Sequence, residues 1–358
     1  MKMGIDIGSL TVKVVAVDER GTVQGWVYLP SHGAPFRTTL RALEDVVNQV
    51  GPGHIRALGI TGSGGRLLSQ YVPGEYVNEL VAQTWALARY HPEARTVIEI
   101  GGQDSKLLVL EEQAGRLTLV DFALNTQCAA GTGSFLEQQA ARLDISIEEF
   151  SRLAAQAKDP PYIAGRCAVF AKSDIVHLQQ MGTPLPEILG GLCLALARNF
   201  CSDVAQGRPF RRPIVFQGGV SKNQGMVRAL EEVLGLAPGE LIIPQHQVLM
   251  PAIGAALAAS RGAGLRWAAV REGLCRAISQ EDGQALTHAR LRAPSHGPAA
   301  QLVPTRGTIP GYLGIDVGSI STKAVAIDEE GNLLAKVYLR TRADPLGATA
   351  ECLRRLGE

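Results

Sequence analysis

Near the beginning of the chain lies Gly4-Ile-Asp-Ile-Gly-Ser-Leu-Thr-Val-Lys13, and this stretch recurs as Gly314-Ile-Asp-Val-Gly-Ser-Ile-Ser-Thr-Lys323. In each copy a Gly-Ser pair interrupts an apolar run, which is typical of a β-hairpin with a tight turn. The likeness continues as far as Leu29 and Leu339. Chance similarity between two strands would not preserve glycine, aspartate and lysine at fixed offsets. The sequence therefore indicates a duplicated domain.

The repeat divides the chain into three parts. Residues 1–260 are predicted to form the first, complete domain, and residues 312–358 hold the start of a second, truncated copy. Between them, residues 261–311 predict a short helix, Leu265–Ile278, followed by a proline-rich linker. At a constant offset, the later motifs of the second copy would fall beyond Glu358.

Bulk composition excludes several classes of protein. With 358 residues, of which 46% are hydrophobic and 19% charged, the chain is able to bury sizeable cores. Its net charge of +1 argues against binding nucleic acid through phosphate neutralisation. No run reaches the roughly 18 apolar residues that a membrane span requires, and the N-terminus lacks a signal-peptide pattern. We therefore expect a cytoplasmic protein that binds neither nucleic acid nor membrane.

Strands and helices alternate through the first domain. The expected strands are Gly4–Ile7, Val12–Asp18, Val23–Leu29, Ala57–Thr61, Thr96–Ile100, Lys106–Leu110 and Pro213–Phe216. The expected helices are Thr38–Val50, Asn78–Tyr90, Thr132–Leu143, Leu185–Cys201 and Pro251–Ala259. This is an α/β pattern with several antiparallel hairpins.

The first hairpin carries the residue types of a phosphate-binding loop, namely Asp6, Gly8, Ser9, Thr11 and Lys13. Glycine lets backbone N–H groups approach phosphate oxygens, and hydroxyl groups add further donors. A carboxylate at a strand end is a ligand for hydrated Mg²⁺. The alternative is an ordinary Gly-Ser hairpin with a surface aspartate, which the recurrence of the motif makes less attractive.

Two further glycine-rich turns follow expected strands. Glu99-Ile-Gly-Gly-Gln-Asp-Ser-Lys106 is a strand–turn–strand of the same kind, and Gln217-Gly-Gly-Val-Ser-Lys-Asn223 ends a strand and opens a helix. The second arrangement suits close approach by the sugar and α-phosphate of a nucleotide. Taken singly, each is explained at least as well by a structural turn. Three such turns in this order favour a nucleotide site that includes Gly101, Gly102, Gly218 and Gly219.

Two phosphate-loop hairpins followed by a late Gly-Gly turn resemble the superfamily of actin, hexokinase and the heat-shock chaperone ATPases (ASKHA), whose fold is ribonuclease H-like. The resemblance implies an α/β fold in which two lobes, built on similar sheets, clamp MgATP in the cleft between them. Glu99 stands where that superfamily usually has aspartate. The sequence therefore leaves open whether Glu99 helps to hold the magnesium ion.

Two of the six cysteines, Cys128 and Cys167, lie just before expected helices. A helix N-terminus lowers the pKa of a thiol, and a cubane iron–sulfur cluster requires four thiolates. One chain would thus supply half of a cluster. The alternative is that both are buried small hydrophobes, the commonest state of free cysteine. The other four lie on an apolar helix, where we expect core positions, or lack informative surroundings: Cys193, Cys201, Cys275 and Cys352.

The cysteine motifs point to a closer resemblance. Together with the two later glycine turns, Cys128-Ala-Ala-Gly-Thr-Gly-Ser-Phe-Leu-Glu137 and Cys167-Ala-Val-Phe-Ala-Lys-Ser-Asp174 are similar to motifs of the BadF/BadG/BcrA/BcrD-type ATPases. These are activators of 2-hydroxyacyl-CoA dehydratases and benzoyl-CoA reductases. The resemblance covers roughly residues 3–260. Asp174 is a departure, because the family more often has glutamate there.

The resemblance implies that ATP hydrolysis drives a conformational change, which delivers a low-potential electron from a [4Fe–4S] cluster to a partner dehydratase or reductase. Cys128 and Cys167 would be cluster ligands, and the cluster would be shared with a second domain, in a homodimer or by pairing with another activator domain. Reduced ferredoxin or flavodoxin would be the electron source. The repeat also resembles a long subclass in which two activator domains share one polypeptide.

Gln103 and Asp104 are the candidates to orient the attacking water in this hydrolysis, which depends on positioning and charge neutralisation. Two other functions remain open. A small-molecule kinase of the same fold, acting on a sugar or a carboxylate, would explain the phosphate loops but would leave both cysteine motifs unused. A non-catalytic, nucleotide-dependent assembly protein would also need no iron.

Overall fold

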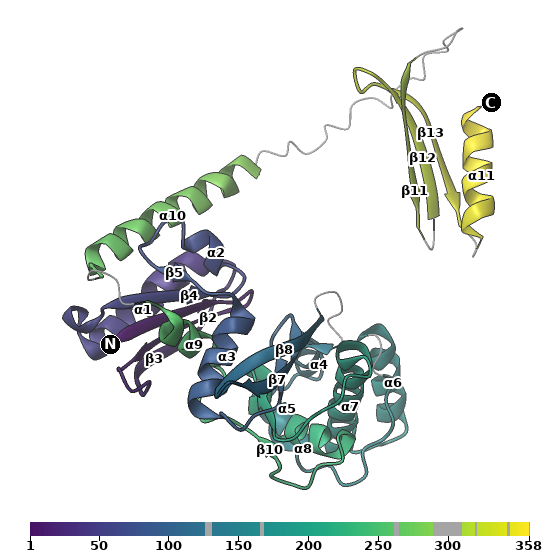
Figure 1. Ribbon diagram of the computed structural model, residues 1–358. Coiled ribbons are helices and arrows are strands. Elements are labelled where there is room, and N and C mark those ends of the chain that lie inside the picture. The colour runs from purple at the N-terminus through teal and green to yellow at the C-terminus, as the bar shows by residue number, and fades with distance from the viewer. Residues whose placement is uncertain are drawn as a thin grey trace. The chain divides into compact units, whose positions relative to one another are not determined.

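The computed structural model describes residues 1–125, 131–164, 168–260, 265–288, 310–318, 321–341 and 344–357. The chain forms two compact units, Met1–Gln284 and Ala285–Glu358 (Figure 1). The first unit contains two lobes, each built on a five-stranded sheet, and the second contains a three-stranded sheet with one helix.

The sheet of the first lobe has β1 at its centre, in the order β3-β2-β1-β4-β5. Its strands are β1 (Lys2–Ile7), β2 (Thr11–Val17), β3 (Val23–Pro30), β4 (Ala57–Thr61) and β5 (Glu75–Tyr76). β1 runs antiparallel to β2 and parallel to β4. β1 and β4 are almost wholly buried, and this agrees with their mainly apolar sequences. The predicted hairpins and the predicted strand Ala57–Thr61 are therefore present.

The sheet of the second lobe repeats this plan in the order β10-β9-β6-β7-β8. Its strands are β6 (Thr96–Ile100), β7 (Ser105–Gln113), β8 (Arg116–Asn125), β9 (Ile214–Gln217) and β10 (Leu241–Ile242). β6 runs antiparallel to β7 and parallel to β9, as β1 does with β2 and β4. Each lobe thus has a hairpin whose turn lies beside the carboxyl end of a parallel strand. The edge strand β8 was not predicted.

Two helices, α3 (Glu79–Tyr90) and α9 (Met250–Ala258), join the lobes (Figure 1). Helix α9 contacts β1, β4 and α3. A Cβ atom on Gly4 of β1 would collide with the carbonyl oxygen of Ala252, so glycine is required for this close approach. One hydrophobic core contains side chains from both sheets, such as Val15 and Leu108, together with Ala86 of α3 and Ile253 of α9.

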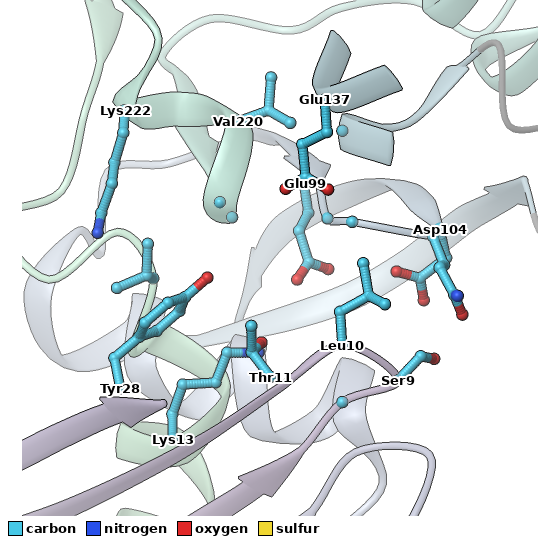
Figure 2. Close-up of a pocket in the computed structure, with 18 of the residues that line it drawn as sticks. Ser9, Leu10, Thr11, Lys13, Tyr28, Glu99, Asp104, Glu137, Val220 and Lys222 are labelled. Atoms are coloured by element: carbon cyan, nitrogen blue, oxygen red, sulfur yellow. The ribbon is translucent and has the colours of Figure 1, made fainter. Parts of the chain in front are cut away.

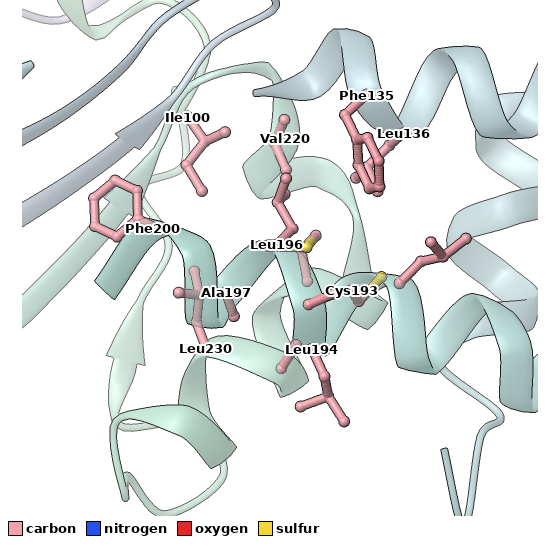
Figure 3. Close-up of a cluster of buried hydrophobic side chains, with 14 of the residues drawn as sticks. Ile100, Phe135, Leu136, Cys193, Leu194, Leu196, Ala197, Phe200, Val220 and Leu230 are labelled. Atoms are coloured by element: carbon pink, nitrogen blue, oxygen red, sulfur yellow. The ribbon is translucent and has the colours of Figure 1, made fainter. Parts of the chain in front are cut away.

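The second lobe has its own core around a buried helix. Its helices are α4 (Gly133–Arg142), α5 (Ile147–Ala154), α6 (Ala168–Gln180), α7 (Leu185–Asn199) and α8 (Gln224–Val233). Figure 3 shows Cys193 and Leu196 of α7 among Phe135 and Leu230 from its neighbours. Within the described ranges, Leu185–Ala205 is the one stretch long and apolar enough to cross a membrane, but 78% of its apolar window is buried in this lobe. Here α7 serves as a core helix.

Four further elements of the first unit belong to the lobe of the first sheet. They are α1 (Pro35–Val50), η1 (Pro52–His54), α2 (Gly65–Leu68) and α10 (Trp267–His288). Helix α10 places Val270, Leu274 and Ala277 in the core beneath β1 and β4. This helix extends beyond the predicted end at Ile278.

The second unit reproduces the first three strands and the first helix of the chain. It consists of β11 (Gly311–Val317), β12 (Ser321–Asp328), β13 (Leu333–Arg340) and α11 (Pro345–Leu356). Asp316 pairs across the hairpin with Lys323 at 2.7 Å, as Asp6 pairs with Lys13 at 2.9 Å. Every residue of β11 is exposed, whereas β1 is buried. In the described part of the second unit, nothing corresponds to β4 or α9.

Candidate functional site

A cavity of about 450 Å³ lies between the two lobes of the first unit. All three predicted glycine-rich turns line it, and Figure 2 shows side chains from both lobes facing it, among them Lys13, Asp104 and Lys222. The cavity brings together all eleven residues predicted for nucleotide binding and hydrolysis: Asp6, Gly8, Ser9, Thr11, Lys13, Gly101, Gly102, Gln103, Asp104, Gly218 and Gly219.

The β1–β2 turn places a lysine and a carboxylate side by side. Asp6 and Lys13 are cross-strand neighbours, and Lys13 Nζ donates a hydrogen bond to Asp6 Oδ2 at 2.9 Å. The Gly8 N–H donates to the Thr11 carbonyl at 2.9 Å and closes the turn. Burial lowers the pKa of Lys13, but the charge and hydrogen bond of Asp6 outweigh this effect, so the pKa is raised overall. A fixed positive charge beside a glycine turn suits a phosphate group.

The β6–β7 turn is attached to the start of α4. The Gly101 N–H donates to the Asp104 carbonyl at 2.9 Å. The N–H groups of Gly133 and Ser134 donate to the carbonyls of Gly101 and Gly102, both at 2.8 Å. The first turn of α4 is therefore held to the turn that carries Gln103 and Asp104. The next turn of the helix brings Leu136 and Glu137 to the cavity wall.

The third turn follows β9. Gly218 has φ of 93°, a conformation that favours glycine, and a Cβ atom there would lie 2.5 Å from the Ile100 carbonyl oxygen. A short 3₁₀ helix, η4 (Gly219–Lys222), leads to Asn223, whose side chain accepts a hydrogen bond from the Met226 N–H and caps α8. The turn therefore ends at a helix N-terminus, an arrangement that favours anionic groups.

Tyr28 and Lys222 form one wall of the cavity and come from different lobes (Figure 2). Lys222 Nζ lies 4.9 Å from the centroid of the Tyr28 ring, within the range of a cation–π interaction. No sequence motif predicts this contact, because Tyr28 and Lys222 lie far apart in the chain and meet only when it folds.

Lys106 is the centre of a polar cluster that the sequence also did not reveal. Its Nζ lies 2.9 Å from Glu79, 3.1 Å from Glu99 and 2.8 Å from Asp104. Burial lowers the pKa of Lys106, but these carboxylates outweigh it and raise the pKa overall. Glu99 also accepts a hydrogen bond from Gln83 at 2.6 Å. The sequence singled out Glu99 and Asp104 in this turn but not their partners on α3, Glu79 and Gln83.

The cavity has more carboxylates than ammonium groups, and this surplus of negative charge suits a divalent cation. Six carboxylates line the cavity, and three ammonium groups lie in it or pair with its acids: Asp6, Glu79, Glu99, Asp104, Glu137 and Glu148 against Lys13, Lys106 and Lys222. In the described ranges, no three His, Cys, Asp or Glu side chains form a ready-made metal site. Magnesium does not need one, because it usually keeps several waters and binds one or two carboxylates together with substrate phosphates. The acidic surplus therefore fits Mg²⁺ bound with a nucleotide.

The two predicted cluster ligands, Cys128 and Cys167, lie outside the described residues. Among the described cysteines, Cys193 is fully buried in the core, and burial raises its pKa. Burial also raises the pKa of Cys201 to about 11. Neither is therefore a ready thiolate ligand. The core position predicted for Cys193 is present, and Cys201 is only partly buried.

Comparisons with known proteins agree with this geometry. A sequence model of the BadF/BadG/BcrA/BcrD ATPase family matches residues 3–259. An activator of lactoyl-CoA dehydratase from Anaerotignum propionicum is 33% identical over 264 residues, which cover 73% of this chain and 98% of that protein. A 2-hydroxyisocaproyl-CoA dehydratase activator from Clostridioides difficile is 30% identical over 257 residues, which cover 71% of this chain and 93% of that one.

Solved structures resemble the fold as well. The activator of the 2-hydroxyisocaproyl-CoA dehydratase from Clostridium difficile, solved with bound ADPNP, aligns with a TM-score of 0.65 and 29% identity, covering 78% of this chain and 97% of that one. The predicted fold, the two-lobed α/β fold of actin, hexokinase and the heat-shock chaperone ATPases, is confirmed.

Proposed function

The chain belongs to the BadF/BadG/BcrA/BcrD ATPase family, and from this premise we propose that it is an ATP-driven electron donor. Its partner would be an enzyme of the 2-hydroxyacyl-CoA dehydratase or benzoyl-CoA reductase type. Two relatives that match this chain are named as activators of such dehydratases. The observation that carries the proposal is the cleft in which all eleven predicted nucleotide residues meet.

In this proposal MgATP lies in the cleft with its phosphates between the two hairpin turns. Lys13 and the N–H groups of the glycine turns bind the phosphate oxygens, and Asp6 and Asp104 hold Mg²⁺ through its water ligands. Gly218 and Gly219 lie against the nucleoside. Gln103 and Asp104 remain the predicted residues for orienting water. Hydrolysis then depends on positioning and charge neutralisation, as in other phosphoryl transfers.

The predicted cluster ligands are Cys128 and Cys167, two in each domain, with the other two from a second activator domain in a homodimer or a paired arrangement. A [4Fe–4S] cluster bound by these cysteines would supply the low-potential electron, with reduced ferredoxin or flavodoxin as the electron source. The hydrogen bonds from Gly133 and Ser134 to the β6–β7 turn support a coupling. Through them the nucleotide turn acts directly on the helix that follows Cys128. We keep the expectation that the protein is cytoplasmic.

Anaerobic purification followed by iron reconstitution tests the proposal. We expect a brown protein with about four irons for each pair of complete domains. Replacing Cys128 with serine is expected to abolish the cluster and to leave nucleotide binding intact, because the residues predicted to bind the nucleotide do not include this cysteine. The matched control is Cys275→Ser, which removes an exposed cysteine from α10.

Two outcomes would contradict the proposal. A cluster that survives in Cys128→Ser would show that the ligand assignment is wrong. A colourless protein that phosphorylates a sugar or a carboxylate would replace the proposal with a kinase of the same fold.

A further inference from the structure

The two hairpin turns to which we assign the phosphates touch each other through Leu10. A Cβ atom on Gly102 of the β6–β7 turn would lie 2.5 Å from Leu10 Cδ1 of the β1–β2 turn. Both residues line the cavity, and Figure 2 shows the Leu10 side chain directed away from the first hairpin, toward the second lobe. Leu10 therefore bridges the two lobes at the phosphate end of the cavity.

The first lobe fixes the backbone at Leu10. The Leu10 carbonyl accepts a hydrogen bond from the Ser31 N–H at 2.8 Å, and Ser31 Oγ donates to the Ser9 carbonyl at 3.2 Å. Ser31 is itself buried. The tip of the first hairpin is thus attached to the segment that joins β3 and α1.

The other side of the contact is anchored as well. The Gly102 carbonyl accepts hydrogen bonds from both the N–H and the hydroxyl group of Ser134. The three atoms nearest to a Cβ at residue 102 all belong to Leu10. The lack of a side chain at Gly102 therefore makes room for this leucine in particular.

Leu10 is an apolar residue in a turn of phosphate-binding residue types. Its neighbours in the motif, Ser9 and Thr11, carry hydroxyl groups, whereas Leu10 has no group that binds a phosphate or a metal ion. Ser9 and Gln103, on either side of the contact, are exposed to solvent. A molecule that approached the γ-phosphate between the two turns would therefore meet the contact of Leu10 with Gly102.

We propose that Leu10 determines the phosphate acceptor: it keeps molecules larger than water away from the γ-phosphate. This role rests on the proposed hydrolysis of ATP. With any acceptor, an oxygen atom forms a bond to the γ-phosphorus, the bond from that phosphorus to the bridging oxygen breaks, and the electron pair leaves with ADP. Water yields inorganic phosphate and an alcohol yields a phosphate ester, and in both cases the proton of the acceptor passes to solvent. The two reactions differ in which acceptor reaches the phosphorus.

The test measures how the phosphate is divided between water and glycerol. Leu10→Ala removes the methyl groups that contact Gly102. The full chain is supplied with ATP and an excess of glycerol, and phosphorus NMR measures glycerol phosphate and free phosphate. The wild type is expected to transfer almost all of the phosphate to water. In Leu10→Ala the ratio of glycerol phosphate to free phosphate should rise by at least about 10-fold, the discrimination that apolar contacts of this size provide.

Two further variants separate selection of the acceptor from a structural role. The matched control is Leu40→Ala, because Leu40 of α1 is also partly buried but does not line the cavity, and it should keep the wild-type ratio. Gly102→Leu, added to Leu10→Ala, supplies an apolar side chain from the opposite turn. Its backbone permits this, since φ at Gly102 lies outside the left-handed region. The double variant should return the ratio toward the wild-type value.

The ratio of products does not depend on how much of the protein is folded or on how fast it turns over. Binding of ADP confirms that each variant is folded. If Leu10→Ala does not bind ADP, Leu10→Val takes its place, because valine lacks the δ-methyl groups but keeps more of the side chain.

Several outcomes would overturn the assignment. If the wild type phosphorylates glycerol as readily as Leu10→Ala does, the contact does not exclude the acceptor. If Leu10→Ala hydrolyses ATP with the wild-type product ratio, Leu10 serves only to pack the two turns. A wild type that binds ATP without hydrolysing it would contradict the proposed function itself. A wild type that hydrolyses ATP but binds no cluster would contradict the proposed electron transfer and leave the role of Leu10 intact.

Discussion

Glu99 illustrates how one methylene group changes the task of a carboxylate. In the superfamily that the sequence resembles, aspartate is usual at this position. Here the longer side chain reaches Gln83 of α3 and Lys106 of β7, at 2.6 Å and 3.1 Å. Both contacts are buried, and a buried polar group is costly unless it is hydrogen-bonded. The length of the side chain therefore serves the packing of α3 against the second sheet.

Glu99→Asp is accordingly expected to destabilise the first unit. The shorter side chain withdraws from Gln83 and leaves a buried donor without its partner, which costs about 1–3 kcal/mol. Chemical denaturation would measure the loss in the free energy of unfolding. The control is Glu93→Asp, the same change at a half-exposed position. Equal stability of Glu99→Asp and the wild type would mean that the two contacts contribute little.

At the scale of elements, the internal repeat allows the same glycine position to be compared in two equivalent strands, β1 and β11. Gly4 lies at the centre of β1, pressed against the backbone of α9. Its counterpart, Gly314, occupies the same place in β11 and has no atom within 4 Å of where a Cβ would be. The same residue is thus demanded by packing in one copy and unconstrained in the other.

Alanine at these two positions should therefore have opposite effects. Gly4→Ala forces α9 away from the sheet, and overpacking of this kind costs about 1–3 kcal/mol. Gly314→Ala should leave stability unchanged or slightly raise it, because alanine loses less backbone freedom than glycine on folding. Thermal and chemical unfolding of the two variants would measure the difference. A similar loss in both would show that the conformation of the strand, not the helix, requires glycine.

The elements that the sequence predicted are those with a local signature. Buried strands such as β4 are apolar runs, and the hairpins are marked by glycine turns. Helix α5 was missed although a signal existed, whereas α8 was predicted, without bounds, as the helix that follows the third glycine turn. Ser146 and Glu149 form a capping pair, since the Glu149 N–H donates to Ser146 Oγ at 3.1 Å, and Asn223 caps α8. Strand β8 is an edge strand, defined by its pairing with β7 more than by burial.

The residues of the candidate site also fall into two groups, those in short local motifs and those that depend on contacts between distant elements. Its glycine turns could be predicted because each is a short motif at a strand end. The roles of Glu79 and Tyr28 could not, because each depends on a contact between elements far apart in the chain: Glu79 with Lys106, and Tyr28 with Lys222. The departure at Glu99 was visible in the sequence, but its cause was not, since Gln83 lies on another helix.

For the molecule as a whole, the two lobes of the first unit are not independent. Helices α3 and α9 share one hydrophobic core with side chains from both sheets, including Val17 and Leu110. Any closure of the cleft must shift this core, because interiors are close-packed and respond as connected bodies. The Glu79–Lys106 pair links the start of α3 to the phosphate turns. A ligand that moves the β6–β7 turn would therefore also act on the interlobe helix α3.

The exposed first strand of the second unit carries a consequence for handling the protein. β11 is an edge in the described sheet, so one row of its backbone N–H and C=O groups is open to another chain. Apolar side chains such as Leu313, which is 54% exposed, lie along this edge.

We expect the protein to self-associate as its concentration rises. Leu313→Lys should suppress this association, because a charged lysine on an edge strand opposes pairing with another chain. Analytical ultracentrifugation over a concentration series would show it. Lys336→Arg, which keeps the charge pattern of β13, should associate like the wild type, and association undiminished in Leu313→Lys would place the contact elsewhere. In the first unit β4 covers the equivalent edge of β1, so the predicted association would reproduce between two copies the pairing that β4 makes there.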